Sequence, residues 1–457
     1  MVPVAAKCNL RTAHGSGGGW LNAMLTANAA TDYLRRHGSP RDLHAYRAQV
    51  PLCDYEGLSP WIQRIAAGEG DVLFRGRPCA FERTGGSSGG AKLIPYAQAG
   101  IADFRRAVSP WLSATLARHR IEGSVYFSIS PAGCEAERLG GIPIGLADTA
   151  YLDDAMAQFL ATHSAVPLSV AACADLAQWR QATARHLAHA LDLELISVWS
   201  PTFLLSLLDA HPELAERWPR LKVISCWADG SSAPYARELA ARFPGVVIEP
   251  KGLISTEAVV TVPDARGMAK LVPHGFFEFL HEGQAFLASE LVPGCDYEVV
   301  VTTASGLYRY RTGDAVRCRG VDAPGRPWLQ FVGRTGLTSD MVGEKLCESF
   351  ASGALACLPG FAMLVPDVRQ RRYVVVREGE TSAEELRNLE SALCRNPQYA
   401  YARALGQLGR LAALQLPHAW ARVERTLVAH GARLGDIKPT ALRTEAFWLD
   451  ALPQEQR

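Results

Sequence analysis

Residues 221–248 read LKVISCWADGSSAPYARELAARFPGVVI, and the order of patterns in this stretch decides the fold class. The apolar runs Leu221 to Cys226 and Val246 to Ile248 predict two strands, and the helix formers from Tyr235 to Ala241 predict a helix between them. A strand, a helix and a second strand in this order are typical of a parallel or mixed sheet covered by helices. We therefore expect an α/β protein.

The same kind of patterning predicts further elements on both sides of this stretch. We expect two amphipathic helices over residues 20–36 and 41–68, a buried strand over 124–129 and a long helix over 170–192. A hairpin is expected over 296–311 and a single strand over 328–332.

The pattern of expected strands and helices changes beyond about residue 335. Short strands are expected at 373–376 and 411–416, and helices at 382–395, where Ser382 is a plausible N-cap, and at 417–429. We place a boundary between Arg334 and Thr338. The prediction is a large N-terminal α/β domain with mixed sheets covered by helices, residues 1–334, and a small mobile C-terminal α+β domain, residues 335–457. Gly333 and Gly336 are the candidate hinge residues.

Composition narrows the classes of function. The chain is 48% hydrophobic and 20% charged with a net charge of +1, so neither nucleic acid nor an acidic membrane is expected as a partner. Its longest apolar stretch, near 195–208, is interrupted by polar residues and falls short of the ~20 residues of a membrane span. The N-terminus lacks the apolar core of a secretory signal. The eleven scattered cysteines favour a reduced, cytoplasmic protein. Oligomeric state is not readable.

Lysine is rare, because seven of the 47 basic residues are lysine and the others are arginine. The remaining lysines are therefore favoured candidates for positions that need a compact ammonium group. They are Lys7, Lys92, Lys222, Lys251, Lys270, Lys345 and Lys438.

The strongest chemical signal is residues 84–92, TGGSSGGAK. Glycines let backbone N–H groups turn toward an anion, hydroxyls add donors, and Lys92 supplies charge, as a triphosphate requires. The spacing is not that of the common NTPase loop. The alternative is a flexible Gly/Ser linker, although the apolar residues on either side place the stretch inside folded structure.

Two weaker signals follow. In residues 306–314, GLYRYRTGD, a strand is expected to end in a Gly-Asp turn whose carboxylate, Asp314, accepts ribose hydroxyls; a solvated Asx turn is the alternative. In residues 252–257, GLISTE, Thr256 and Glu257 stand at a strand-to-loop junction, where they suit a nucleotide and Mg²⁺. Capping of a helix N-terminus is the alternative there.

The order of these motifs is more specific than any one of them. A Ser/Thr/Gly-Lys loop, Thr-Glu, Tyr-Arg-Thr-Gly-Asp and then Gly333-Arg334 resembles the adenylating superfamily of acyl-CoA synthetases, peptide-synthetase adenylation domains and luciferases. Lys92-Leu93-Ile94-Pro95, residues 306–311 and Lys438-Pro439 resemble one branch, the Gretchen Hagen family of auxin-responsive acyl-acid amido synthetases. The resemblance covers residues 20–445, and the shorter length is typical of a bacterial member.

The resemblance implies an N-terminal adenylating domain and a two-step reaction. ATP, with Mg²⁺, converts a carboxylic acid into an acyl-adenylate, and an amine or amino acid then takes the acyl group. Two departures bear on the details: the plant phosphate loop is one residue longer, and Leu253 stands where the family has an aromatic residue.

The resemblance also assigns roles. Thr84, Gly85, Gly86, Ser87, Ser88, Gly89 and Lys92 would hold the phosphates. Thr256, beside Ser255, would lie at the α-phosphate or acyl oxygen, and Glu257 would bind the metal. Asp314 and Arg334 would hold the ribose. Tyr310 would line the nucleoside pocket, with a core tyrosine as the alternative.

The resemblance to the adenylating superfamily further implies that Lys438 bridges the acyl carboxylate and the α-phosphate, where negative charge accumulates during adenylation. The alternative is a solvated lysine in a turn. Lys345 is expected to be structural or close to the hinge. Phe127, Ser128, Ile129, Ser130 and Trp227 are candidates for the acyl pocket, with core packing as the alternative.

Two other functions remain open from the sequence. An acyl-CoA ligase of the same fold would replace the amine with coenzyme A, although no basic cluster near residues 210–220 or the hinge favours that. A non-catalytic nucleotide-binding relative is disfavoured by the presence of Lys92, Glu257, Asp314 and Lys438.

Overall fold

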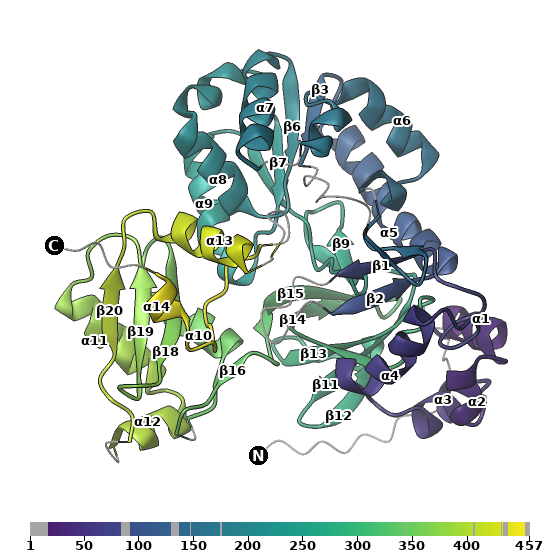
Figure 1. The fold of residues 1–457 in the computed structure, drawn as a ribbon. Helices are drawn as coiled ribbons and strands as arrows, with labels where there is room; N and C mark the ends of the chain where they lie inside the picture. The colour runs from purple at the N-terminus through teal and green to yellow at the C-terminus, as the bar shows by residue number, and fades with distance from the viewer. Residues whose placement is uncertain are drawn as a thin grey trace.

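The computed structural model describes residues 17–83, 92–128, 137–146, 148–173, 176–342, 344–404, 407–430, 432 and 437–452. In Figure 1 a parallel sheet and its helices lie at the top of the molecule and a large antiparallel sheet lies below them. The C-terminal elements, in light green and yellow, lie to one side of both.

The parallel sheet confirms the central prediction. Its four strands, in the order β3-β6-β7-β8, are all parallel. They are β3 (Ser124–Phe127), β6 (Leu193–Ser197), β7 (Val223–Cys226) and β8 (Val247–Pro250), and α9 (Ala233–Arg242) crosses between the last two. The carboxyl ends of all four strands therefore lie along one edge, which is where open α/β sheets bind ligands.

Both faces of this sheet are buried, as a parallel sheet requires. Tyr126, Ile196 and Ile224 pack in one apolar cluster with α7 (Leu176–His189), α8 (Pro201–Ala210) and α9. Their neighbours on the opposite face, Leu195 and Val223, pack in another with α6 (Asp154–His163). The helix expected over 170–192 thus begins later, at Leu176, after a 3₁₀ turn, Leu168–Ala172.

The large sheet has seven antiparallel strands in the order β12-β11-β13-β14-β15-β10-β9. They are β9 (Thr261–Pro263), β10 (Ala269–Leu271), β11 (Phe276–His281), β12 (Gln284–Leu287), β13 (Asp296–Thr302), β14 (Tyr310–Val321) and β15 (Pro327–Arg334). The predicted hairpin is β13 and β14, but its second strand begins at Tyr310. The preceding residue, Arg309, has a φ of +47° and is fixed by two hydrogen bonds of 2.8 and 2.9 Å to the buried Glu278 carboxylate.

One expectation about this hairpin is wrong. Asp314 does not follow a strand end, because β14 continues through it to Val321. The pairing with β13 shifts between Glu298, opposite Ala315, and Val300, opposite Arg311. The residues Thr312 to Asp314 therefore form a bulge opposite the single residue Val299.

The N-terminal helical region is more broken than expected. The two predicted helices are four: α1 (Gly18–Asn28), α2 (Asp32–Arg36), α3 (Leu43–Gln49) and α4 (Tyr55–Ala66). New helices begin where an aspartate caps the first turn. Asp42 accepts from the Ala45 N–H at 2.8 Å and Asp54 from the Gly57 N–H at 3.1 Å. A hairpin, β1 (Ala80–Arg83) and β2 (Leu93–Tyr96), and α5 (Gln98–Arg118) follow.

The residues from 335 onward, called here the C-terminal unit, contain a three-stranded sheet in the order β18-β19-β20. Its elements are β16 (Thr338–Ser339), β17 (Leu346–Cys347), α10 (Glu348–Leu355), β18 (Ala362–Asp367), β19 (Arg372–Arg377), α11 (Ala383–Leu393), α12 (Pro397–Ala404), β20 (Ala412–Gln415), α13 (Ala419–Ala429) and α14 (Trp448–Ala451). Ser382 caps α11 as predicted, in a capping box with Glu385.

The C-terminal unit packs against both sheets. Arg180 of α7 donates to Glu424 of α13 at 2.5 Å, and the rings of Tyr235 and Trp420 lie 6.4 Å apart. At β15, Gly333 has a φ of +148°, and a Cβ there would lie 2.7 Å from the Cα of Ser349 in α10. The structure gives one arrangement of the two parts, and the mobility of the C-terminal unit and its boundary stay predictions.

Among the described residues, every helix is too short or too polar to cross a lipid bilayer.

A pair of glycine substitutions tests how tightly the chain is held after β8. Gly252 has a φ of +77°, and an added Cβ would lie 2.6 Å from the Thr261 carbonyl oxygen. Gly267 has a similar φ of +75° with no atom within 4 Å of that position. Both Gly→Ala changes introduce left-handed strain, but only Gly252→Ala adds a clash, so it should lower the free energy of unfolding by roughly 1–3 kcal/mol more. Urea unfolding of both variants measures the difference, and equal losses would contradict the close approach.

Candidate active site

The hairpin of β1 and β2 brackets the predicted phosphate-binding stretch. Arg83 pairs with Leu93 in antiparallel register, so the chain leaves β1 and enters β2 at the same end of the hairpin. The predicted phosphate-binding residues Thr84, Gly85, Gly86, Ser87, Ser88 and Gly89 lie outside the residues that the structure describes. Their roles therefore stay predictions.

Lys92 is the first described residue after that stretch. Its Nζ lies 5.4 Å from the ring centroid of Tyr55 in α4. The Tyr55 hydroxyl also accepts a hydrogen bond of 3.0 Å from the Leu93 N–H. An aromatic face attracts an ammonium group and adds no formal negative charge. Lys92 is thus held at the start of β2 in a way that suits a phosphate contact.

Thr256 and Glu257 lie in a tight turn and not at the start of a helix. The Ser255 N–H donates to the Ala258 carbonyl oxygen at 3.0 Å, and Ile254 and Val259 form an isolated bridge. The Tyr96 hydroxyl donates to the Thr256 carbonyl oxygen at 2.5 Å. The helix-capping alternative is therefore wrong, and the turn is tied directly to the hairpin that holds Lys92.

Asp314 and Arg334 stand opposite each other on β14 and β15. The Arg334 Nε lies 3.3 Å from the Asp314 Oδ1, and the Arg334 guanidinium also donates to the Thr312 carbonyl oxygen at 3.1 Å. Asp314 is buried, so the solvated-turn alternative is wrong. The pair offers one carboxylate and one guanidinium side by side, which are suitable groups for two adjacent sugar hydroxyls.

Electrostatics link the Thr-Glu turn to this pair. Burial raises the pKa of the Glu257 carboxyl above its usual value, the nearby negative charge of Asp314 raises it further, and Arg334 opposes the rise. Burial also raises the pKa of the Tyr310 hydroxyl, again with a contribution from Glu257. Tyr310 is 2% exposed and is a core tyrosine beside the site. The structure thus brings together residues from three of the sequence motifs.

Glu348, which the sequence did not single out, connects this group to the C-terminal unit. Its side chain is 3% exposed. One carboxylate oxygen accepts from the Arg334 N–H at 2.9 Å, and the other accepts from the Ala441 N–H at 3.1 Å. Ala441 is close in sequence to Lys438, so a single carboxylate positions both the end of β15 and the segment that carries the predicted catalytic lysine.

Lys438 lies against the large part of the molecule. Its Nζ is 4.2 Å from the ring centroid of Trp227, which directly follows β7. Lys438 is exposed to solvent as well as in contact with this ring, and its catalytic role stays a prediction. Lys345 is exposed with a φ of +43°, next to β17. Of the acyl-pocket candidates, Phe127 ends β3 and Ser128 follows it, at the same sheet edge as Trp227. Ile129 and Ser130 lie outside the described residues.

Lys251 was noted from the sequence only as one of the rare lysines and was given no role there. It follows β8, is 3% exposed, and donates to the Ser197 hydroxyl at 2.6 Å. Its Nζ lies 5.4 Å from the Trp111 ring centroid and 5.1 Å from that of Trp199. Burial lowers its pKa to about 8. The rarity of lysine, together with a position at the carboxyl end of a parallel strand, was the signal that pointed to it.

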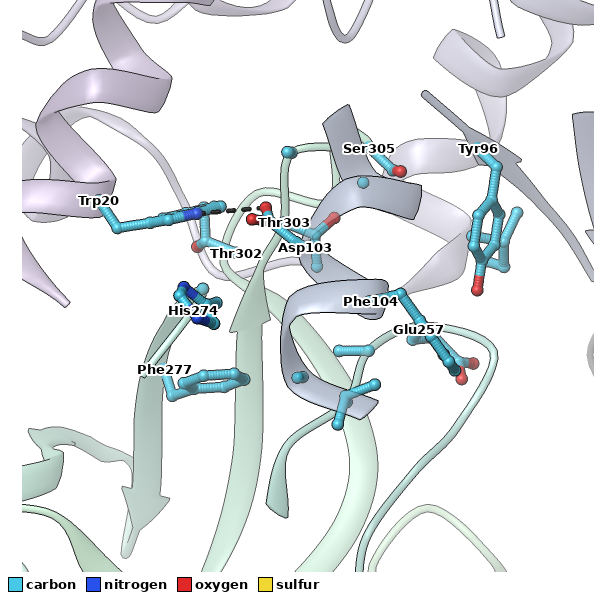
Figure 2. Close-up of a pocket in the computed structure, with 17 residues that line it drawn as sticks. Trp20, Tyr96, Asp103, Phe104, Glu257, His274, Phe277, Thr302, Thr303 and Ser305 are labelled. Carbon is cyan, nitrogen blue, oxygen red and sulfur yellow. Dashed lines mark hydrogen bonds between the residues drawn. The ribbon is translucent and has the colours of Figure 1, made fainter. Parts of the chain in front are cut away.

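An open pocket adjoins Glu257 on the side of α1 and α5. Its cavity volume is about 50 Å³, and Figure 2 shows Tyr96, Phe104 and Glu257 on one side and Trp20, His274 and Phe277 on the other. The Trp20 indole donates to Asp103 at 3.2 Å. The lining of the pocket is mainly apolar, and burial lowers the pKa of His274, which is one of its lining residues.

Within the described ranges, no group of three or more histidine, cysteine, aspartate and glutamate side chains is arranged to hold a metal ion by itself. Mg²⁺ beside phosphates is commonly held by one or two carboxylates together with oxygen atoms of the substrate and water.

Solved structures of two enzymes share this fold. A GH3.15 acyl acid amido synthetase matches with a TM-score of 0.80 over 96% of this chain and 93% of that one, at 21% identity. A 2-hydroxyisobutyryl-CoA ligase in complex with 2-HIB-AMP matches with a TM-score of 0.55 over 97% of this chain and 95% of that one, at 13% identity. The fold is that of the adenylate-forming enzymes, as the order of the sequence motifs predicted.

The sequence gives the narrower assignment. The GH3 family N-terminal domain matches residues 12–214 and the GH3 family central domain matches residues 269–334, more than half of the chain together. This chain belongs to the GH3 family of acyl-acid amido synthetases, and it is a ligase.

Two curated relatives illustrate the family. The probable indole-3-acetic acid-amido synthetase GH3.1 of Oryza sativa subsp. japonica is 28% identical over 75% of this chain and 70% of its own length. The jasmonoyl--L-amino acid synthetase JAR4 of Nicotiana attenuata is 24% identical over 72% of this chain and 70% of its own length.

The buried Lys251 predicts a pH-dependent contribution to stability. Its folded pKa of about 8 lies below the ordinary value of 10.5, so between these pH values the unfolded chain binds more protons. The lysine's contribution therefore destabilises the fold below pH 8 and becomes less unfavourable as the pH rises toward 10.5. The difference in free energy of unfolding, wild type minus Lys251→Met, should increase by about 3 kcal/mol from pH 7 to 10.5, at ~1.4 kcal/mol per pKa unit.

Urea unfolding of both proteins across this pH range provides the measurement. Other tyrosines and cysteines that titrate in the same range are common to both proteins and cancel in the difference, apart from Cys226, whose pKa is raised by burial and lowered by the nearby charge of Lys251. If the difference in free energy of unfolding does not change with pH, the pKa of Lys251 is not lowered by the fold.

Proposed function

We propose that this protein uses ATP to convert a carboxylic acid into an acyl-adenylate and then transfers the acyl group to an amine, with an amino acid as the expected class of acceptor. AMP and pyrophosphate are the other products. The observation that carries the proposal is the meeting of Glu257, Asp314 and Arg334, three charged residues from separate motifs, beside the hairpin that holds Lys92.

The chemistry explains why such a site is needed. A carboxylate resists attack by an amine because it is anionic and has no good leaving group, and transfer to AMP removes both obstacles. In this proposal Asp314 accepts the ribose hydroxyls, and Arg334 binds the same sugar. Lys92 and the predicted loop residues hold the phosphates.

Lys438 and Thr256 act at the reacting atoms. The Lys438 ammonium group offsets the negative charge that gathers where the acid joins the α-phosphate, and electrostatic stabilisation of this kind is commonly the largest contribution to catalysis. Thr256, in the turn fixed by Tyr96, orients the same phosphate or the acyl oxygen. No side chain is assigned as the base for the amine.

Glu257 suits Mg²⁺ by the chemistry of its surroundings. It is a partly buried carboxyl whose negative form is disfavoured by burial and by Asp314, and a divalent cation would relieve both effects. Mg²⁺ held there would contribute positive charge beside the phosphates.

The C-terminal unit is proposed to rotate between the two half-reactions, because a lysine that is needed for adenylation obstructs the approach of the amine. Gly336 supports a pivot after β15, since an added Cβ there meets no atom within 4 Å. Rotation would separate Lys438 from Trp227.

The identity of the acid is approached through relatives. Family members are named for indole-3-acetic acid and jasmonoyl conjugates, and one solved GH3.15 structure contains 2,4-DB. Small organic acids with a ring or apolar body are thus the first class to screen. The cytoplasm is the proposed compartment, since the nine cysteines that the structure describes are all free thiols.

A substrate screen tests the proposal. The purified protein is incubated with ATP, Mg²⁺ and a matrix of organic acids and amino acids, and amides, AMP and pyrophosphate are detected. Formation of ADP and phosphate would contradict adenylation. A parallel arm with coenzyme A and no amine identifies an acyl-CoA ligase, and absence of acid-dependent ATP–pyrophosphate exchange across the panel would favour a non-catalytic role.

A single substitution tests the metal role of Glu257. Glu257→Gln removes the negative charge but keeps the size, so acid-dependent ATP–pyrophosphate exchange should fall by about 10²-fold and need more Mg²⁺ for half of its maximal rate. The exposed Glu384→Gln variant is the matched control and should behave as the wild type. An unchanged Mg²⁺ requirement in Glu257→Gln would assign the metal to other groups.

A further inference from the structure

Trp227 stands in the middle of a row of four side chains that crosses from the parallel sheet to the C-terminal unit. Lys438 lies 4.2 Å from the centroid of its ring. The ring of Trp199 lies 5.8 Å from that of Trp227, at an interplanar angle of 37°. Beyond Trp199 lies the buried ammonium group of Lys251, 5.1 Å from the Trp199 centroid. Two cations thus flank a pair of indole rings.

The backbone of the parallel sheet sets this arrangement. Trp199, Trp227 and Lys251 each follow one of the three neighbouring strands β6, β7 and β8. The Trp227 N–H donates to the Trp199 carbonyl oxygen at 2.9 Å, and the Lys251 N–H donates to the Cys226 carbonyl oxygen at 3.1 Å. The strand ladder therefore continues past the strand ends and holds the three residues at one level of the sheet edge.

The loop that carries Trp227 is also fixed by contacts with β15. Gln330 of β15 donates to the Asp229 carboxylate at 3.2 Å. An added Cβ on Gly230 would lie 3.1 Å from the ring of Phe331 in β15. The same strand, β15, ends at Arg334. The loop that carries Trp227 is therefore fixed, through Asp229 and Gly230, to the strand that ends at Arg334.

Lys251 stabilises the end of the row that lies opposite Lys438. Its ammonium group is held by the Ser197 hydroxyl at 2.6 Å and lies between Trp111 and Trp199. Cation–ring attraction favours one orientation of the Trp199 indole, and this ring is the surface on which Trp227 rests.

An aromatic ring is a suitable partner for a lysine that acts on anions. Its face attracts an ammonium group through the ring quadrupole. A carboxylate partner would attract it more strongly, but would also add a negative charge at the place where an acid and a phosphate have to be bound. The ring contact directs the lysine without that opposing charge.

We propose that Trp227 is a positioning residue for the adenylation half-reaction, holding the Lys438 ammonium group at the carboxyl edge of the parallel sheet. The proposal rests on the proposed function, in which Lys438 acts during adenylation. Trp227 acts through Lys438, and the contact is broken when the C-terminal unit rotates for the transfer of the acyl group to the amine.

Two assays on an acid and amine found by the screen separate the half-reactions. Acid-dependent ATP–pyrophosphate exchange reports adenylation, and conversion of the chemically synthesised acyl-adenylate with the amine reports transfer. Trp227→Leu should lower the exchange rate by roughly three- to thirty-fold, the range of a cation–ring contact, with transfer within about twofold of wild type. Trp227→Phe, which keeps a ring, should restore most of the exchange.

A double-mutant cycle tests whether the effect passes through Lys438. In a Lys438→Ala background, Trp227→Leu should cause no further loss of exchange. Trp328→Leu is the matched control, because Trp328 also contacts a lysine, Lys270 at 4.9 Å, away from the site. It should leave both assays within about twofold of wild type. If Trp227→Leu does not fold, Trp227→Met, which also lacks a ring, takes its place in the cycle.

Each contrary outcome has a distinct meaning. Unchanged exchange in a folded Trp227→Leu protein overturns the inference. An equal loss in the Lys438→Ala background, or a change confined to KM for the acid, also overturns it and makes Trp227 a wall of the acyl pocket. A wild-type protein that shows no exchange with any acid contradicts the proposed function itself.

Discussion

The Glu348 carboxylate is the group on which the geometry of the site depends most directly. It accepts one backbone N–H from Arg334, at the end of the large sheet, and another from Ala441, in the segment that carries Lys438. Burial raises its pKa, yet two backbone donors and the nearby Arg334 favour the charged form. A buried carboxylate without these partners would be strongly disfavoured. The pairing of Asp314 with Arg334 and the approach of Lys438 are thus coupled through one side chain.

Much of the fold could be predicted, because local patterns and global packing agree there. The strand-helix-strand order of residues 221–248 and the Ser382 cap both specify structure locally. The Gly313-Asp314 expectation was wrong because a bulge opposite Val299 is decided by the neighbouring strand, which local patterns do not reveal. The long N-terminal helices were wrong for a related reason, since aspartate caps start new helices inside an apolar pattern.

The candidate site was predictable as a set of residue types but not as a set of contacts. Glu257, Asp314 and Arg334 came from motif order, and their electrostatic coupling is visible only in three dimensions. Lys251 and Glu348 carry no motif, so only their burial and partners distinguish them. Glu424 and Trp420, which join the C-terminal unit to the helices of the parallel sheet, belong to the same class.

Because Gly333 has no Cβ atom, the C-terminal unit can pack closely against the end of β15. Because α10 approaches to the distance that only a hydrogen atom tolerates, the separation of β15 from the C-terminal unit is set by the smallest side chain available. Any larger residue there would act as a wedge. Gly333 therefore sets the distance between β15 and α10, and with it how far Lys438 of the C-terminal unit extends toward the parallel sheet.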